Sequence, residues 1–141
     1  MKVLVPLDDS EVSLRALDWV AVLQRECASV EVELLNVRPL AEHYGSVSAL
    51  DHAAVERALR EAQQRVLARA LHHGARTGLQ HLAAHAAQGL PAEAIVEAAR
   101  AQGVDQIVMA THGRGAVGAF FLGSVAQRVA HLAPMPVTLV K

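Results

Sequence analysis

Short apolar runs alternate along the chain with longer segments in which apolar residues recur at helical spacing. The runs cover residues 2–7, 30–37, 79–87, 105–111 and 137–140. Brief runs rich in Val, Leu and Ile and bounded by polar turns are typical of strands that are buried on both faces. The pattern predicts five strands, and 79–87 is the weakest of them because it is rich in alanine and interrupted by two histidines.

The segments between the runs predict four amphipathic helices. The first begins after an N-cap at Ser10, and its apolar stripe consists of Val12, Ala16, Trp19, Leu23 and Cys27. The second covers residues 49–75, and its inner face consists of Val55, Leu59, Ala62, Val66 and Ala70. The third follows a turn at residues 89–91, and the fourth covers residues 124–132 before Pro134 and Pro136 end it.

The alternating order of these elements, β-α-β-α-β-α-β-α-β, indicates the α/β class. It predicts a doubly wound, five-stranded parallel sheet with helices on both faces, similar to the Rossmann fold. At 141 residues the chain is long enough for one domain over 1–141 and too short for two of ordinary size. The last strand, 137–140, is expected at a sheet edge, where an unblocked strand favours pairing with a second copy.

Composition and charge argue against several classes of function. The formal net charge is −1 and aromatic residues make up 3%, so we expect no nucleic-acid partner. Cys27 is the only cysteine, which excludes an internal disulfide, and its place on the apolar stripe predicts a small buried side chain. No apolar run approaches the ~20 residues of a membrane span, and Pro6 and Asp8 interrupt the first run too early for a signal peptide. We therefore expect a cytoplasmic protein.

Residues 111–124 hold four of the nine glycines and connect the fourth predicted strand to the fourth helix. Open parallel sheets bind ligands at such strand ends, and a helix N-terminus offers N–H groups that favour phosphate. Gly113 and Gly123 would let an oxygen approach the backbone, while Ser124 would cap the helix and add a donor. In the alternative interpretation, Ser124 is only a cap and the glycines only form turns.

Several stretches of the sequence resemble the universal stress protein family. They are VLVPLDDSE at residues 3–11, GLPAEAI at 89–95, and the C-terminal residues 108–114, 123–126 and 133–137. The matches run from end to end of the chain, in order and at the family's spacing. The resemblance implies a five-stranded doubly wound domain that usually forms dimers, and one branch of that family binds ATP.

The ATP-binding branch has the pattern Gly-x2-Gly-x9-Gly-Ser/Thr across this loop. The loop of this chain resembles that pattern, with Ala110 in place of the first glycine. If the backbone at Ala110 has negative φ the methyl group costs little, whereas at positive φ it costs about 1 kcal/mol. By the resemblance, Asp8 and the backbone around Val37 would contact the nucleoside, and the loop would hold the phosphates with Arg114 as an added positive contact. The candidate site residues are Asp8, Val37, Ala110, Gly113, Arg114, Gly123 and Ser124.

Two hypotheses for function follow. In the first, the protein is a stress-response or regulatory homodimer that binds an adenine nucleotide, with ATP favoured over ADP or AMP and with or without Mg²⁺. In the second, favoured by Ala110, it is a dimeric stress-type interaction protein that works without a nucleotide. An enzyme has the least support, because the chain has neither a nucleophile elbow nor a P-loop lysine, and slow ATP hydrolysis is the most we expect.

Structural roles are expected for the other conspicuous residues. The histidines at 72 and 73 diverge on a helix and those at 81 and 85 lie about 13 Å apart on a strand, so no metal site is predicted. Asp9 is expected to be a solvated acid at the start of the first helix. Of Phe120 and Phe121, one is expected to pack over the base of the loop and the other to be partly exposed.

Overall fold

The computed structural model describes residues 1–27, 29–40, 49–113 and 122–141. Its strands are β1 (Lys2–Pro6), β2 (Glu31–Arg38), β3 (Leu82–Gln88), β4 (Gln106–Ala110) and β5 (Val137–Val140). Its helices are α1 (Glu11–Glu26), α2 (Ala49–Arg76), α3 (Pro91–Ala101) and α4 (Ser124–Leu132). The predicted alternation of strands and helices is confirmed.

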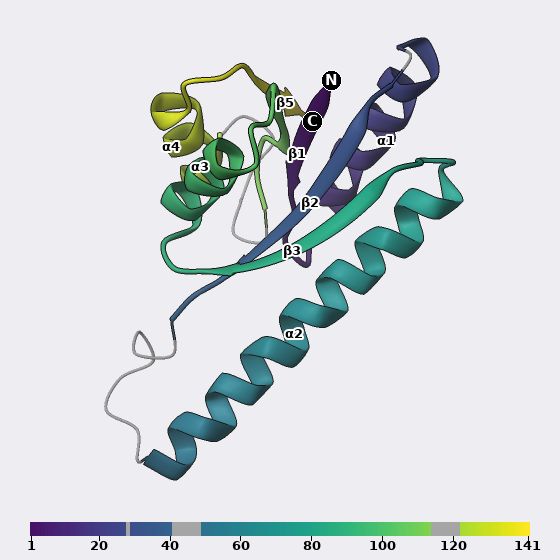
Figure 1. The fold of residues 1–141 in the computed structure, drawn as a ribbon. Coiled ribbons are helices and arrows are strands. Elements are labelled where there is room, and N and C mark those ends of the chain that lie inside the picture. Colours follow the sequence, from purple (N-terminus) through teal and green to yellow (C-terminus); the bar gives the residue numbers. More distant parts are fainter. Residues whose placement is uncertain (28, 41–48, 114–121) are drawn as a thin grey trace.

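The strands form one parallel sheet in the order β3-β2-β1-β4-β5, and β5 is an edge strand as predicted (Figure 1). Helices α1 and α2 cover one face of this sheet, and α3 and α4 cover the other. Along β1, Val3 and Val5 join the core beneath α1, whereas Leu4 joins the core beneath α3 and α4. Since successive side chains point to opposite faces, a strand covered on both sides is apolar at every position. The predicted doubly wound fold is confirmed.

Helix α1 turns a different face to the core from the one predicted. Ser10 is its N-cap, as expected, and accepts a hydrogen bond from Ser13 N. The buried residues are Ser13, Leu14, Ala16, Leu17, Val20 and Ala21. The predicted stripe lies at the side of this face, so Trp19 is 36% exposed. The prediction of a buried Cys27 is wrong, because Cys27 follows the helix as an extended C-cap and is exposed.

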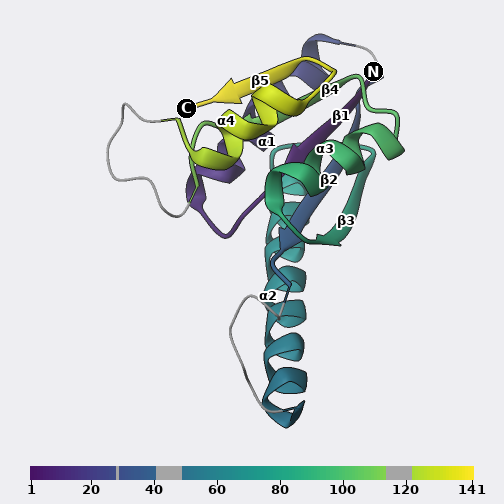
Figure 2. The same ribbon diagram turned by 90° about the vertical axis from the view of Figure 1, so that its left-hand side faces the viewer.

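Helix α2 extends well beyond the sheet at its N-terminal end (Figures 1 and 2). The five residues of its predicted inner face are all at least partly buried, and of these five Ala70 is fully buried. Strand β3 begins at Leu82, later than predicted, because His81 has φ 54 and so leaves the extended conformation. Within the described residues, no helix combines the length and apolar character needed to cross a membrane.

Candidate functional site

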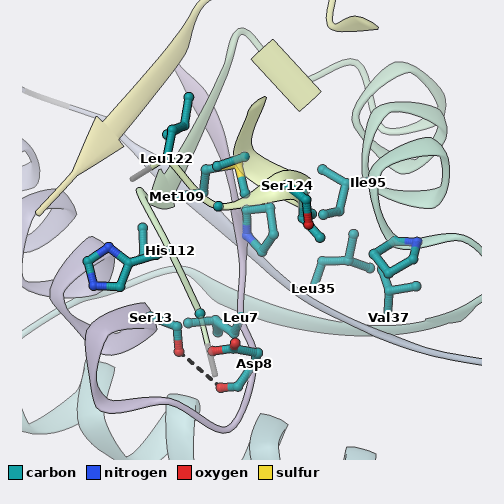
Figure 3. Close-up of a pocket in the computed structure, with 17 residues that line it drawn as sticks. Leu7, Asp8, Ser13, Leu35, Val37, Ile95, Met109, His112, Leu122 and Ser124 are labelled. Atoms are coloured by element: carbon teal, nitrogen blue, oxygen red, sulfur yellow. Dashed lines mark hydrogen bonds between the residues drawn. The ribbon is translucent and has the colours of Figure 1, made fainter. Parts of the chain in front are cut away.

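A cavity of about 530 Å³ lies at the carboxyl ends of β1, β2 and β4, beside the first turns of α3 and α4 (Figure 3). Open parallel α/β folds hold their ligands at this edge of the sheet. Six of the seven candidate residues line the cavity: Asp8, Val37, Ala110, Gly113, Gly123 and Ser124. The seventh, Arg114, lies outside the described residues, as do Phe120 and Phe121. The fold therefore gathers positions that are far apart in the sequence.

Apolar side chains make up much of the cavity wall, including Leu7, Leu35, Ile95, Met109 and Leu122 (Figure 3). Among the described lining residues, Asp8 and His112 carry ionisable side chains, and none is Lys or Arg. The His112 Nδ1 atom lies 3.0 Å from Thr111 Oγ1. In this part of the cavity, a negatively charged ligand would therefore be met by backbone N–H groups rather than by cationic side chains.

Asp8 follows β1 and is held by the turn that leads into α1. Its Oδ1 atom accepts hydrogen bonds from the backbone N of Ser10, at 3.0 Å, and from Ser10 Oγ. The Ser13 hydroxyl lies 2.9 Å from the carbonyl oxygens of both Asp8 and Ser10 and shares its single proton between them. Figure 3 shows the contact with Asp8. Since Ser10 also caps α1, the same local hydrogen bonds start the helix and fix the carboxylate at the cavity.

Gly113 lies against the Asp8 carboxylate. A β-carbon added at Gly113 would overlap Asp8 Oδ2 and would lie 3.2 Å from Asp8 Cγ. The sequence suggested that this glycine admits a ligand oxygen, but in the structure a protein carboxylate occupies the space that a side chain would fill. Gly113 is therefore needed for Asp8 to take its place in the cavity wall.

The start of α4 differs from the prediction in one respect. Gly123, with φ −61, is the N-cap and makes no side-chain hydrogen bond, whereas Ser124 is the first helical residue. The prediction that Ser124 caps the helix is therefore wrong, because the chain enters the helical conformation one residue earlier. No acidic residue lies in the first turn, and no described side chain caps the N-terminal N–H groups of α4, which lie beside the cavity.

Val37 lies in β2 at a level where the neighbouring strand β1 has already ended. Leu7 N donates to Leu35 O at 2.8 Å, and Gly89 N donates to Arg38 O at 3.0 Å on the β3 side. Because successive residues of a strand address alternate neighbours, the N–H and C=O of Val37 point to the β1 side. Within the described part of the chain, no hydrogen bond takes up either group there. Val37 thus offers a donor and an acceptor at the cavity.

Two buried amide side chains lie beside these strand ends, and the sequence analysis did not assign them a role. Asn36 Nδ2 donates to Leu7 O at 2.7 Å. Gln63 Nε2, from α2, donates to the carbonyl oxygens of Asn36 and Ala87, each at 2.8 Å. The available signal was Asn36 itself, a polar residue in the otherwise apolar stretch 34–37.

Ala110 lies inside β4, is buried, and is paired in register with Val140. It is not among the non-glycine residues with positive φ, which are Ser29 and His81 in the described structure. The backbone at Ala110 therefore does not have the positive φ at which the sequence analysis expected the alanine methyl group to cost about 1 kcal/mol. An alanine at this position strains neither the strand nor the cavity wall.

Asp9 and two of the four histidines considered in the sequence analysis contact other side chains. Asp9 is exposed and pairs with Arg69 of α2, whose Nη1 atom lies 3.5 Å from Asp9 Oδ1. His73 Nε2 lies 2.6 Å from Asp18 Oδ1, and His85 Nε2 lies 2.6 Å from Glu33 Oε2. Among the residues that the structure describes, no group of three or more His, Cys, Asp or Glu side chains is arranged to hold a metal ion.

Known proteins that are similar to this chain align with it over nearly its full length. A universal stress protein of Thermus aquaticus is 39% identical over 142 residues, covering 99% of this chain and 97% of its own. The solved structure of protein MJ0577, determined to assign its biochemical function, is 29% identical with a TM-score of 0.83. That alignment covers 99% of this chain and 94% of MJ0577.

Three solved universal stress proteins of this fold have adenine nucleotides bound. The Archaeoglobus fulgidus protein, in complex with dAMP, is 22% identical with a TM-score of 0.70, and 100% and 98% of the two chains are covered. Another is a complex with cAMP and an Arabidopsis thaliana protein has AMP bound, at 22% and 19% identity and TM-scores of 0.75 and 0.69. The model of the universal stress protein family matches residues 1–141. This chain belongs to the universal stress protein family.

Proposed function

We propose that the cavity binds an adenine nucleotide and that the protein acts as a nucleotide-binding regulator of the stress response in the cytoplasm. The observation that carries this proposal is the convergence of three kinds of group on one cavity: the backbone donor and acceptor of Val37, the fixed carboxylate of Asp8 and the uncapped first turn of α4. They suit a base edge, ribose hydroxyls and a phosphate respectively. Adenine nucleotides in other proteins of this fold support the same assignment.

ATP, with or without Mg²⁺, is our first candidate for the nucleotide, and ADP and AMP are the next. The spacing of Gly113, Gly123 and Ser124 matches the ATP-binding branch, and Ala110 has the extended backbone of a strand. Gly123 is closely packed, since an added β-carbon would lie 3.1 Å from His112 Cα and 3.2 Å from Thr111 O. A large side chain there would shift the start of α4 away from the cavity.

Mass spectrometry of freshly purified, denatured protein tests the proposal, followed by thermal shift with ATP and Mg²⁺, AMP and GMP. We expect a stoichiometric adenine nucleotide, or a concentration-dependent rise in Tm with the adenine nucleotides. Gly123→Leu should abolish the rise while leaving a folded protein by circular dichroism. Absence of both bound nucleotide and thermal shift in the wild type would favour the nucleotide-independent interaction protein.

We also propose that two copies pair through the free edge of β5. Trp19 is 36% exposed and lies about 100° further round α1 than Asp18, the residue that contacts His73 of α2. Because α1 packs against β5, we expect Trp19 to be covered when a second sheet adds to this edge. Light scattering should give a dimer that Trp19→Glu converts to a monomer, while Val22→Glu, also on exposed α1 surface, leaves it intact. A monomeric wild type would contradict this pairing.

A further inference from the structure

We infer that Asn36 is a positioning residue for base recognition: its side chain occupies the Leu7 carbonyl and thereby keeps the backbone of Val37 available to the nucleotide base. This inference rests on the proposed function, because it concerns how the same cavity distinguishes one base from another. Asn36 does not reach the ligand in this account. It acts through the backbone groups of the neighbouring residue.

The first step is the ladder between β1 and β2. Pro6 is in register with Leu35, and Leu7 N donates to Leu35 O at 2.8 Å. In a parallel ladder the next hydrogen bond would run from Val37 N to Leu7 O. That acceptor is instead taken by Asn36 Nδ2 at 2.7 Å. A side chain of β2 has therefore replaced the backbone donor that would have extended the ladder.

The second step is burial, because a buried amide needs a hydrogen-bond partner within the protein. Asn36 is 7% exposed and Gln63 is 6% exposed, so neither amide can satisfy its hydrogen bonds in water. Gln63 bonds to the carbonyl oxygens of Asn36 and Ala87 and so fixes β2 against β3 from the α2 side. Toward β1, Asn36 satisfies its own Nδ2 by donating to Leu7 O, and the β1–β2 ladder ends at this point.

The third step concerns the base. Adenine presents a donor, the N6 amino group, beside the N7 acceptor, whereas guanine presents two acceptors, O6 and N7. The Val37 C=O and N–H together complement the adenine pair. With this N7 edge turned toward Val37, guanine would place O6 against the C=O, which would lose its hydrogen bond. We therefore expect the wild type to prefer AMP over GMP by about tenfold or more, and we assign that preference to the unpaired state of Val37.

The test combines amide hydrogen exchange with binding of AMP and GMP, using the full chain. In the wild type without nucleotide, the Val37 amide should exchange at least about tenfold faster than the Leu35 amide, and AMP should slow it. Asn36→Leu removes the donor at Leu7 O and lets Val37 N take its place. In this variant we expect slower Val37 exchange, about tenfold weaker AMP binding and a smaller ratio of AMP to GMP affinity.

Gln63→Leu is the matched control, since it also removes a buried amide from this cluster but leaves Leu7 O untouched. It should lower Tm while keeping fast Val37 exchange and the preference for AMP. A wild-type Val37 amide as slow as that of Leu35 would overturn the role of Asn36 whether or not any variant folds. An unchanged AMP-to-GMP ratio in Asn36→Leu would do the same. Failure of the wild type to bind AMP, by contrast, would overturn the proposed function itself.

Discussion

The two ends of the β1–β2 pair differ in how completely their backbone groups are used. At the amino end, Glu31 N donates to Met1 O at 2.9 Å, and Asp105 N donates to Lys2 O at 2.8 Å. Lys2 N in turn donates to Asp105 Oδ2 at 2.7 Å, and Lys2 Nζ lies 3.4 Å from Glu33 Oε1. At the carboxyl end, β1 stops at Pro6 while β2 continues to Arg38, and no described residue bonds to the backbone of Val37 on the β1 side.

This difference shows how one sheet can separate stability from binding. Backbone groups that are paired within the protein contribute to stability and have nothing left to offer a ligand. Groups left unpaired at a cavity are a cost until a ligand or water completes their hydrogen bonds. Substitutions at the amino end should therefore change the free energy of unfolding alone, whereas those at the carboxyl end should change nucleotide affinity first.

The largest effect on binding is expected from Gly113→Val at the carboxyl end. Its β-carbon would overlap Asp8 Oδ2, so the carboxylate must leave the cavity wall. We expect nucleotide affinity, measured by calorimetry, to fall by about tenfold or more, since a polar partner of the ligand is lost. Gly103→Ala is the control: it strains a residue with φ +61, has no neighbour within 4 Å and lies at the opposite end of β4. Equal losses of affinity in both variants would contradict the assignment of Asp8 to the site.

At the amino end, Asp105→Ala removes the acceptor for Lys2 N while both backbones remain in place. Because this hydrogen bond is exposed, we expect a loss of about 1 kcal/mol in the free energy of unfolding, measured with urea. Nucleotide affinity should stay the same within error. A stable variant with weakened affinity would mean that the two ends are coupled.

A smaller effect is expected from Ala110→Gly, which restores the glycine of the ATP-binding pattern. Ala110 lies in a strand with ordinary φ, so glycine removes no strain there. We expect affinity to stay within about twofold and stability to fall by about 0.5–1 kcal/mol, because glycine weakens a strand. Calorimetry and urea unfolding measure the two quantities. A large gain in ATP affinity would show that the alanine does obstruct the ligand.

The smallest effect is a pH dependence at the attachment of α2. Arg38 makes a two-pronged ion pair with Glu56, at 2.6 and 3.0 Å, and this hydrogen bonding lowers the pKa of the Glu56 carboxyl below 4.5. A lowered folded-state pKa contributes stability that is present above about pH 4.5 and is lost as pH falls through the folded-state pKa. The difference in urea midpoint between wild type and Glu56→Gln should therefore be larger at pH 7 than at pH 3. A difference that grows toward acid pH would refute this account.

Some boundaries could be predicted residue by residue. Strand 137–140 and helix 124–132 are confirmed at both ends, because Pro134 and Pro136 end one element and fix where the next begins. The face of α1 could not be predicted in the same way. The helix carries two overlapping apolar stripes, and contacts with the sheet and α2 decide that Leu14, Leu17 and Ala21 are buried while Trp19 is not.

The candidate site shows the same division. Its seven residues follow from motif spacing and resemblance, and the fold brings the six described ones to one cavity. Asn36 and Gln63 were not assigned a role, since a buried amide is recognised only by its partners. Those partners, Leu7 O and the carbonyl oxygens of β2 and β3, lie 24 to 29 residues away in the sequence.

The sequence by itself determined the order of strands and helices and the glycine-containing entry to α4, because hydrophobic period and turn residues act over a few neighbouring positions. Only the tertiary structure decided which backbone groups remain unpaired and which glycine makes room for a carboxylate. Those outcomes depend on where two strands end relative to each other and on side chains that meet across the sheet. Local pattern carries no information about such distances.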